Sequence, residues 1–177
     1  MGLRKGHCYT KIERPYTRKS KVKSKSYIKT IPPLKIARFE MGDVSGFNKG
    51  KYNCFVMLTV TEPVQIRDNA LEAARQYAHK KLEEKLKGNF YFVLNAHPHH
   101  ILRENKMLTG AGADRMQTGM SHSFGKPIGI AAQLMKGDKI FSVACNREAI
   151  PAVREILNKI KSKLPGKKTI VVEEIKK

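Results

Sequence analysis

The chain has 177 residues, and its 35 lysines and arginines against 15 aspartates and glutamates give a formal net charge of +20. A charge of this size indicates a polyanionic partner and favours nucleic acid. A membrane surface is the weaker alternative, because no apolar run approaches the roughly 18 residues of a transmembrane helix and no signal peptide is recognisable. We therefore expect no membrane partner and a cytoplasmic location.

Residues 1–34 are predicted to form a basic arm that closes at Pro32-Pro33. Residues 1–30 alone carry ten basic side chains and one acid, a net charge of +9. The arm has few apolar residues to bury, so we expect it to stay disordered until it meets its polyanion, because ordering costs conformational entropy. A solvated tail without specific contacts is the alternative.

Lysines recur at every second position from residue 19 to residue 25, so an extended backbone would place them on one side. Tyr9, Tyr16 and Tyr27 lie among the cations. Tyrosines stack on unpaired bases while lysine and arginine contact phosphates. The arm residues predicted to neutralise phosphates are Arg4, Lys5, Lys11, Arg14, Arg18, Lys19, Lys21, Lys23 and Lys25.

Residues 35–177 are long enough for one hydrophobic core and are predicted to form a single domain. Apolar segments at 36–39 and 52–61 predict strands, the second of which ends before Pro63. A helix is predicted from Asp68 or Asn69, because apolar residues then recur at three- and four-residue spacing until Gly88. Its apolar face consists of Leu71, Ala74, Ala78, Leu82 and Leu86. Residues 90–96 predict another strand, and residues 101–103 are a candidate extension of it.

The last part of the chain contains the pattern of a β-hairpin, in which segments 128–135 and 140–145 flank a turn with Gly137. A second helix follows the cap residue Asn146, carries Pro151 in its first turn and ends at Pro165-Gly166. Its apolar face consists of Ile150, Val153, Leu157, Ile160 and Leu164. With a last strand at 169–172, the pattern predicts an α+β sandwich of a mixed sheet and two helices.

The segment between the predicted strands, 102–127, is expected to be a functional loop. Loops of this length are uncommon in compact domains and are usually either functional or disordered. Its glycines allow backbone geometry that other residues resist. Apolar side chains such as Met107 and Phe124 argue against an inert linker, and Asp114, Arg115 and Gln117 offer polar contacts.

Three histidines, His97, His99 and His100, stand together where a strand is predicted to end. No further cluster of aspartate, glutamate or cysteine completes a metal site that can be read from the sequence. Packing or contact with RNA is therefore the favoured interpretation of these imidazoles. Neither a metal nor a cofactor is predicted.

Enzyme signatures are weak elsewhere. Gly110-Ala111-Gly112 lacks the Gly-Lys-Ser/Thr sequence of a phosphate-binding loop. Cys54 and Cys145 lie in apolar runs, where cysteine usually behaves as a small core residue, and no pair of closely spaced cysteines indicates zinc or a disulfide framework. Glu104 and Asp114 each adjoin an arginine, which favours ion pairing over general acid–base chemistry.

The loop motifs resemble the signature of the universal large-subunit ribosomal protein sixteen family, in its archaeal and eukaryotic ten-e branch. The motifs are Asn105-Lys106-Met107-Leu108, Ala111-Gly112-Ala113-Asp114-Arg115, Gln117-Thr118-Gly119-Met120 and Phe124-Gly125-Lys126-Pro127. Further matches are Cys8-Tyr9, Pro15-Tyr16, Leu71-Glu72-Ala73-Ala74-Arg75, His97-Pro98 with His100, and Pro165-Gly166. Ser121-His122 stands where eukaryotic relatives carry Arg-Gly, and the chain stops soon after Lys176, which favours an archaeal source.

The resemblance implies an α/β-hammerhead fold without catalytic activity. It implies a position on large-subunit (23S) rRNA between the central protuberance and the peptidyl transferase centre, and a role in late subunit assembly. The implied partners are this rRNA, neighbouring ribosomal proteins and tRNA in the aminoacyl and peptidyl sites, with 5S rRNA as a further candidate. His97, His99, His100 and Lys126 join the arm cations as expected rRNA contacts. The residues expected to face tRNA are Asn105, Lys106, Gly110, Gly112, Asp114, Arg115, Gln117 and Gly119.

Two other classes of function remain open from the residues alone. One is a freestanding RNA-processing enzyme whose loop covers an active site, which perturbed pKa values, a metal or a small ligand would support. The other is a non-ribosomal RNA-binding module with a single defined RNA ligand.

Overall fold

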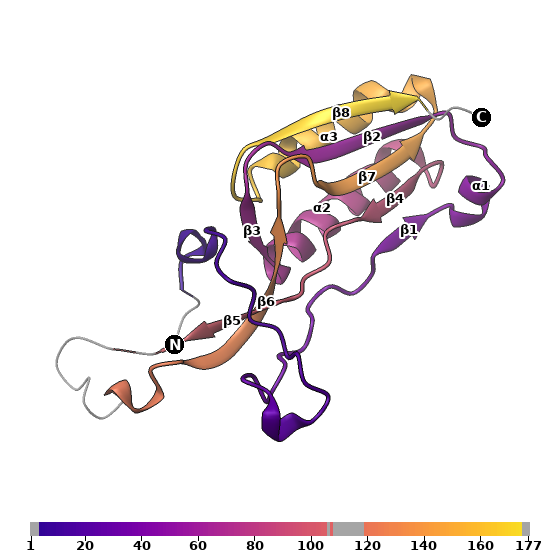
Figure 1. Cartoon of the computed structure of the whole chain (residues 1–177). Coiled ribbons are helices and arrows are strands. Elements are labelled where there is room, and N and C mark those ends of the chain that lie inside the picture. The colour runs from indigo at the N-terminus through magenta and orange to yellow at the C-terminus, as the bar shows by residue number, and fades with distance from the viewer. Residues whose placement is uncertain (1–3, 106, 108–118, 175–177) are drawn as a thin grey trace.

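The computed structural model describes residues 4–105, 107 and 119–174. Within these residues the chain is an α+β protein with two antiparallel sheets and two long helices, as Figure 1 shows. No helix in this part of the chain is long and apolar enough to cross a membrane.

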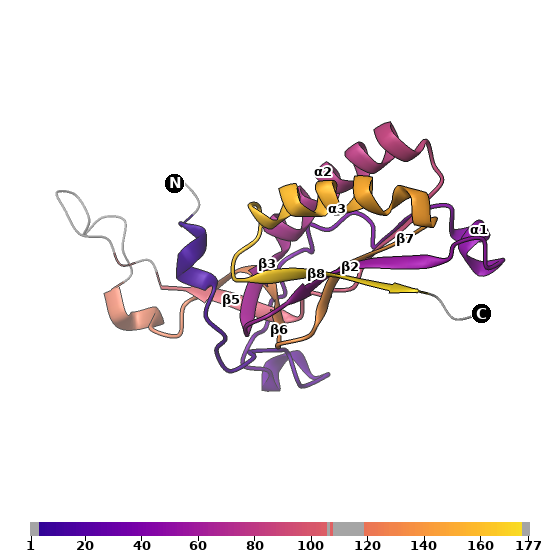
Figure 2. The same cartoon turned by 90° about the horizontal axis from the view of Figure 1, so that it is seen from above.

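The larger sheet, sheet A, has five strands in the order β1-β4-β7-β2-β8. Their bounds are Glu40–Gly42 (β1), Cys54–Val60 (β2), Tyr91–Leu94 (β4), Lys139–Cys145 (β7) and Lys168–Glu174 (β8). Every neighbouring pair is antiparallel. The helices α2 (Asp68–Leu86) and α3 (Ile150–Lys161) lie side by side on one face of this sheet (Figure 2).

The smaller sheet, sheet B, has three antiparallel strands in the order β3-β6-β5. Their bounds are Val64–Arg67 (β3), Lys126–Leu134 (β6) and His100–Glu104 (β5). Sheet B projects away from sheet A (Figure 1). The short elements are α1 (Val44–Asn48) and the 3-10 turns η1 (Gly6–Tyr9), η2 (Lys23–Lys25), η4 (Gly119–His122) and η5 (Arg147–Ala149).

The helix predicted with Asp68 or Asn69 as its cap is confirmed as α2, but the cap is wrong, because the helix includes both residues and Arg67 precedes it without a side-chain capping bond. The predicted apolar residues from Leu71 to Leu82 are fully buried, and Leu86 packs at the edge of the core. The helix ends because Lys87 adopts the left-handed conformation, with φ 47°, and Gly88 follows with φ 83°. Glycine accepts this geometry at no steric cost, which explains the stop.

The second predicted helix is confirmed as α3, with Pro151 in its first turn, but it ends at Lys161, before the predicted stop at Pro165-Gly166. Asn146 precedes the turn η5, as a cap residue would, but its side chain makes no capping hydrogen bond. The predicted capping interaction is therefore wrong. After the helix, the Lys168 ammonium donates hydrogen bonds to the carbonyls of Leu164, Pro165 and Gly166 at 2.7, 2.9 and 2.6 Å. These bonds satisfy backbone acceptors beyond the helix end.

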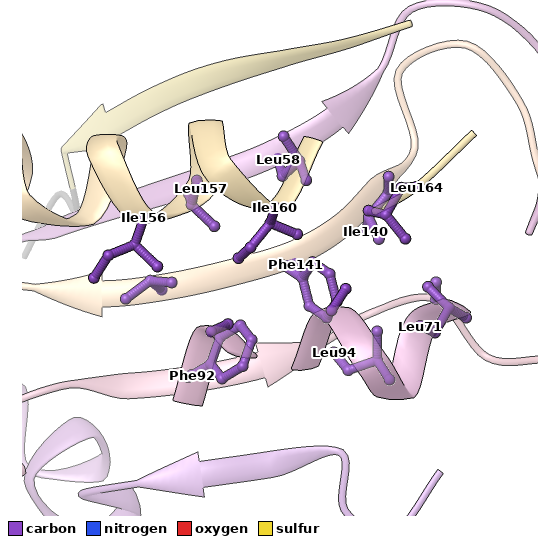
Figure 3. Close-up of a cluster of buried hydrophobic side chains, with 14 of the residues drawn as sticks. Leu58, Leu71, Phe92, Leu94, Ile140, Phe141, Ile156, Leu157, Ile160 and Leu164 are labelled. Atoms are coloured by element: carbon purple, nitrogen blue, oxygen red, sulfur yellow. The ribbon is translucent and has the colours of Figure 1, made fainter. Parts of the chain in front are cut away.

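One hydrophobic core joins both helices to both sheets. Figure 3 shows Ile156, Leu157 and Ile160 of α3 facing the sheet strands that carry Leu58 and Phe141. Residues of β3 and β6, namely Val64, Ile66, Ala132 and Leu134, belong to the same cluster. Sheet B is therefore part of the same folded body and not a separate unit.

The two core cysteines are confirmed as buried hydrophobes. Cys54 and Cys145 are direct partners across β2 and β7 and are 2% and 0% exposed. Burial raises the pKa of the Cys145 thiol to about 11. A nucleophilic thiolate is therefore disfavoured at this position.

Five predictions about strands and sheets need correction. The predicted hairpin is wrong: β6 and β7 lie in different sheets, and the turn around Gly137 is a corner between them. At this corner the Gly137 amide donates to the carbonyl of Val60 at 2.8 Å, and the Val60 amide donates to that of Asp138 at 3.0 Å. The turn is therefore hydrogen-bonded to β2 and not closed as a hairpin, and β6 pairs in sheet B.

The other corrections concern the type of sheet and three single strands. The predicted mixed sheet is instead two antiparallel sheets. Residues 101–103 belong to β5 of sheet B and do not extend β4. The strand predicted at 36–39 forms at Glu40–Gly42. The prediction ends the strand before Pro63 and does not include β3, because Pro63 is at a corner after which a new strand begins.

A buried ion pair fixes α2 against the segment that leads into β1. The Arg75 guanidinium donates from Nε and Nη2 to the Glu72 carboxylate at 2.8 and 2.6 Å, and its Nη1 lies 3.0 Å from the Met41 sulfur. The Ala37 amide donates to the same carboxylate at 3.4 Å. These hydrogen bonds, chiefly from Arg75, lower the pKa of Glu72 to about 2.

We expect Glu72→Gln to lower the free energy of unfolding at neutral pH by about 2 kcal/mol, because Arg75 would lose its charged partner. The wild-type advantage should be complete above pH 4.5 and disappear as the pH falls toward 2, since the carboxylate pKa is depressed by folding. Urea unfolding at several pH values measures both effects. The control is Glu84→Gln, which breaks only an exposed pair with Lys81 and should cost little. Equal losses in the two variants would contradict the prediction.

Candidate RNA interface

The basic arm crosses sheet B from one edge to the other. The Gln65 amide of β3 donates to the carbonyl of Thr10 at 2.9 Å, and the Ile101 amide of β5 donates to that of Tyr16 at 3.1 Å. Between them, the Gln133 side chain of β6 donates to the carbonyl of Glu13 at 2.8 Å. Figure 1 shows this indigo segment passing over β6 and β5.

This course corrects the expectation that the arm is disordered until it meets RNA. The sequence suggested too little apolar surface for order, but backbone hydrogen bonds to the strand edges and a few buried side chains hold the arm. Ile28 is 2% exposed and Ser26 is 6% exposed. The boundary of the arm at residue 34 stays a prediction.

Tyr9 anchors the first part of the arm. Its hydroxyl donates to the Glu104 carboxylate of β5 at 3.0 Å, and the carboxylate also pairs with Arg4 at 2.9 Å. The Arg67 guanidinium lies 5.2 Å from the ring centroid of Tyr9. Burial and the contact with Glu104 raise the pKa of Tyr9 to about 12. Glu104 is ion-paired as predicted, but its partner is Arg4 and not the adjacent Arg103 from which the pairing was predicted.

Arg103 joins the arm to the base of the loop. Its guanidinium lies 3.9 Å from the ring centroid of Tyr16 and 3.8 Å from that of Phe124, and it donates to the Phe124 carbonyl. The two rings meet edge to face at 5.7 Å. Sequence reasoning missed this stack, because its three members lie far apart in the chain and no local motif connects them.

Gly125 closes the loop against β5. It has φ 81°, and a Cβ atom there would lie 2.7 Å from the backbone carbon of Glu104. No other residue fits this approach without a shift of backbone. The loop is also shorter than predicted, since residues 102–104 belong to β5 and residues 126–127 to β6.

The three histidines take separate positions. His97 is exposed and stacks on Phe39, with ring centroids 4.7 Å apart. His99 is also exposed, and its Nδ1 lies 3.2 Å from the His97 carbonyl oxygen. Among the described residues there is no group of three side chains that could hold a metal ion.

His100 is buried and binds the backbone of the arm. It is 3% exposed, and its Nδ1 accepts a hydrogen bond from the Tyr16 amide at 2.9 Å. Burial lowers the pKa of this imidazole, with His99 and Arg103 adding to the effect and Glu13 opposing it. The expectation of a direct RNA contact is therefore corrected for His100, whose side chain positions the arm.

The predicted phosphate-binding residues of the arm are largely free to meet a partner. All except Arg18, which is half-buried, are exposed, although Arg4 also pairs with Glu104. Lys126 is exposed at the start of β6. The one-sided lysine row is corrected, because Lys23 and Lys25 lie in the turn η2 and not in an extended segment.

Only two of the residues predicted to face tRNA are described by the structure. The Asn105 side chain donates to the carbonyl of Gly119 at 3.4 Å, which ties the two ends of the loop together. Lys106, Gly110, Gly112, Asp114, Arg115 and Gln117 lie outside the described residues.

The hydrogen bond from the Tyr16 amide to His100 predicts that the attachment of the arm to sheet B weakens when the imidazole is protonated. Protonated imidazole has no acceptor, so this bond is lost in the charged form. Because burial lowers the folded pKa, the stabilisation is complete above the ordinary pKa of 6.5 and is lost as pH falls through the folded value.

We therefore expect the hydrogen-exchange protection factor of the Tyr16 amide to fall several-fold between about pH 7.5 and about pH 5. The Gln65 amide, whose acceptor is the Thr10 carbonyl, is the internal control and should keep its protection. His100→Asn offers an acceptor that does not titrate and should remove the pH dependence. Unchanged protection of Tyr16 in the wild type would refute the assignment.

Comparisons with known proteins agree with the family that the motifs suggested. The family model of ribosomal protein L16p/L10e matches residues 12–171. The chain is similar to "Large ribosomal subunit protein uL16" of Sulfolobus acidocaldarius, with 46% identity over 100% of this chain and 97% of the relative. Proteins of the same name from Thermofilum pendens and Staphylothermus marinus are 44% and 43% identical, over 98% and 99% of this chain and 99% and 97% of the relatives.

These relatives are archaeal ribosomal proteins and not enzymes, which confirms the expectation that the chain has no catalytic role. The match covers the arm from residue 12, both sheets, both helices and most of β8. The chain therefore belongs to the ribosomal protein L16p/L10e family.

Proposed function

We propose that this chain is a structural constituent of the large ribosomal subunit and binds large-subunit rRNA with the surface formed by the arm and sheet B. The observation that carries the proposal is that the backbone of the arm is fixed while its cationic side chains are available to a partner. The arm backbone is bonded to β3 and β5, while its cationic side chains other than Arg18 stay exposed. The family and the names of the relatives support the same function.

Prior ordering of the arm favours binding to RNA. A chain that folds only on binding loses conformational entropy at that moment, which weakens its affinity. Here the hydrogen bonds from Gln65, Gln133 and Ile101 have already fixed the path of the arm. The lysines and arginines then displace counterions from phosphates, which makes affinity depend on salt.

The finer placement of the protein is proposed from the family resemblance. It comprises the α/β-hammerhead fold, the site between the central protuberance and the peptidyl transferase centre, contact with 5S rRNA, and a part in late subunit assembly. It also includes a loop directed toward tRNA. Support for the loop comes from its rigid base, where Gly125, Arg103 and the Asn105–Gly119 bond set the two points at which the loop begins and ends.

Neutralising the four lysines at positions 19, 21, 23 and 25 with glutamine should weaken binding to large-subunit rRNA and flatten its salt dependence. Each lost phosphate contact should reduce the slope of log affinity against log salt by roughly 0.7–0.9. Because all four side chains are exposed, the fold should be unchanged. The matched control neutralises four exposed lysines elsewhere, Lys49, Lys80, Lys136 and Lys167. Equal changes of slope in the two variants would contradict a specific role of the arm.

Replacing residues 108–118 with a Gly/Ser linker of equal length should leave incorporation into large subunits intact. The replaced segment excludes Gly119, Arg103 and Gly125, so the base of the loop is preserved. We expect these subunits to sediment normally but to bind tRNA poorly, as gradient profiles and tRNA binding on one preparation would measure. Normal tRNA binding would refute the assigned direction of the loop, and absence of the variant from subunits would assign the loop to assembly.

A further inference from the structure

A small pocket opens where the arm meets the loop base. It has a volume of about 230 Å³ and is lined by Arg14, Pro15, Tyr16 and Thr17 of the arm, by Lys19 and Tyr27 farther along it, and by Phe124 of the loop base. The lining is mainly aromatic and apolar and includes the two cations Arg14 and Lys19. No carboxylate is among the described residues that line it.

Tyr27 is held on a fixed frame but exposes its whole ring. It is 90% exposed, whereas its neighbours Ser26 and Ile28 are 6% and 2% exposed. The Ser26 hydroxyl donates to the carbonyl of Ser20 at 3.0 Å, and the turn η2 lies between these two residues. An exposed aromatic ring between two buried residues gives up the free energy that its own burial would contribute. Its exposure therefore suggests that a partner covers it.

A second aromatic residue of the lining, Phe124, is held by its neighbours. Phe124 is 43% exposed, and its ring is fixed by the Arg103 guanidinium at 3.8 Å and by the edge of Tyr16 at 5.7 Å. Arg103 places a positive charge next to these rings without entering the pocket lining. A flat, electron-rich ligand can therefore stack on a surface that does not need to reorganise.

Two side chains of the lining supply positive charge for an anion. Arg14 and Lys19 line the pocket and are exposed, and no ion pair or hydrogen bond with another described residue engages either side chain. The volume is smaller than the roughly 300–1,000 Å³ of sites for drug-sized ligands. It is also too small for a duplex, so a single planar group attached to phosphates is the ligand that fits.

We propose that this pocket receives one unstacked nucleotide of RNA, with its base against Tyr27 and Phe124 and its flanking phosphates on Arg14 and Lys19. The inference rests on the proposed function and adds to it a site that reads a single base by stacking. Stacking tolerates every base, so the site recognises an extruded nucleotide by its shape more than by its sequence. An aromatic side chain of a protein partner is the competing occupant.

The test uses the full chain and three stem-loop RNAs that differ at one position. The first carries a single bulged 2-aminopurine, the second an abasic residue in the bulge, and the third no bulge. We expect the first RNA to bind about tenfold tighter than the other two, a preference in the range of base–aromatic stacking. Quenching of 2-aminopurine fluorescence on binding reports the stacking directly.

Variants distinguish stacking in the pocket from the general affinity of the protein for RNA. Tyr27→Ala should abolish the tenfold preference and the quenching, and Tyr27→Phe should retain both, because the phenyl ring stacks equally well. Met120→Ala, at a side chain that is 67% exposed outside the pocket, is the control for loss of an exposed apolar group. Lys19→Gln should weaken the 2-aminopurine and abasic RNAs alike, because both keep the phosphates that flank the bulge, and should weaken the RNA without a bulge less. Circular dichroism checks that the fold is unchanged.

A preference that persists in Tyr27→Ala, or equal binding of the three RNAs by the wild type, would overturn the inference. Binding to intact large-subunit rRNA, measured on the same protein, keeps the two proposals apart. If that binding is normal, only the pocket assignment fails, and if it is absent, the proposed function fails as well. A preference for an acidic phenylalanine-containing peptide over the bulged RNA would assign the pocket to a protein partner and also overturn it.

Discussion

The corner at which two chain segments leave sheet A for sheet B sets the position of the surface that we propose to bind RNA. Val60 ends β2 there and exchanges hydrogen bonds with the turn around Gly137. The connection from β2 to β3 is therefore joined to the connection from β6 to β7. The pairing of β2 with β7 shifts in register just before this point, between Leu58 and Thr59. Such irregularities bend strands and increase their twist. Because Val64, Ile66, Ala132 and Leu134 share the main core, sheet B is fixed in direction, and it presents the arm and the loop base.

The arm shows how a strongly basic segment can be ordered without a core of its own. Its backbone satisfies the edge amides of β3 and β5, which would otherwise be open to other strands. The neutral form of His100 accepts the Tyr16 amide, so the arm is held by an imidazole whose charge would break the bond. The exposed cations then add affinity for a polyanion without being needed for the fold.

Aromatic rings and one guanidinium join the arm to the loop. Arg103 stacks on Tyr16 and Phe124, which come from the arm and from the loop base. A shift of either segment would disturb the other, because both rings lie against the same cation. The pocket that we assign to an unstacked nucleotide lies beside this stack, so occupation of the pocket and the geometry of the loop base are physically connected.

The sequence by itself determined the two helices, the buried cysteines, the basic surface and the family, because each rests on local spacing or on composition. The apolar spacing from Leu71 to Leu82 and the stop at Gly88 predicted α2 correctly. Only the tertiary structure decided that β6 and β7 part into different sheets, that His100 is buried, and that the arm is held on sheet B. A glycine turn such as that at Gly137 fits a hairpin and a corner equally well locally. The hydrogen bonds that decide between them come from Val60, a residue far away in the chain.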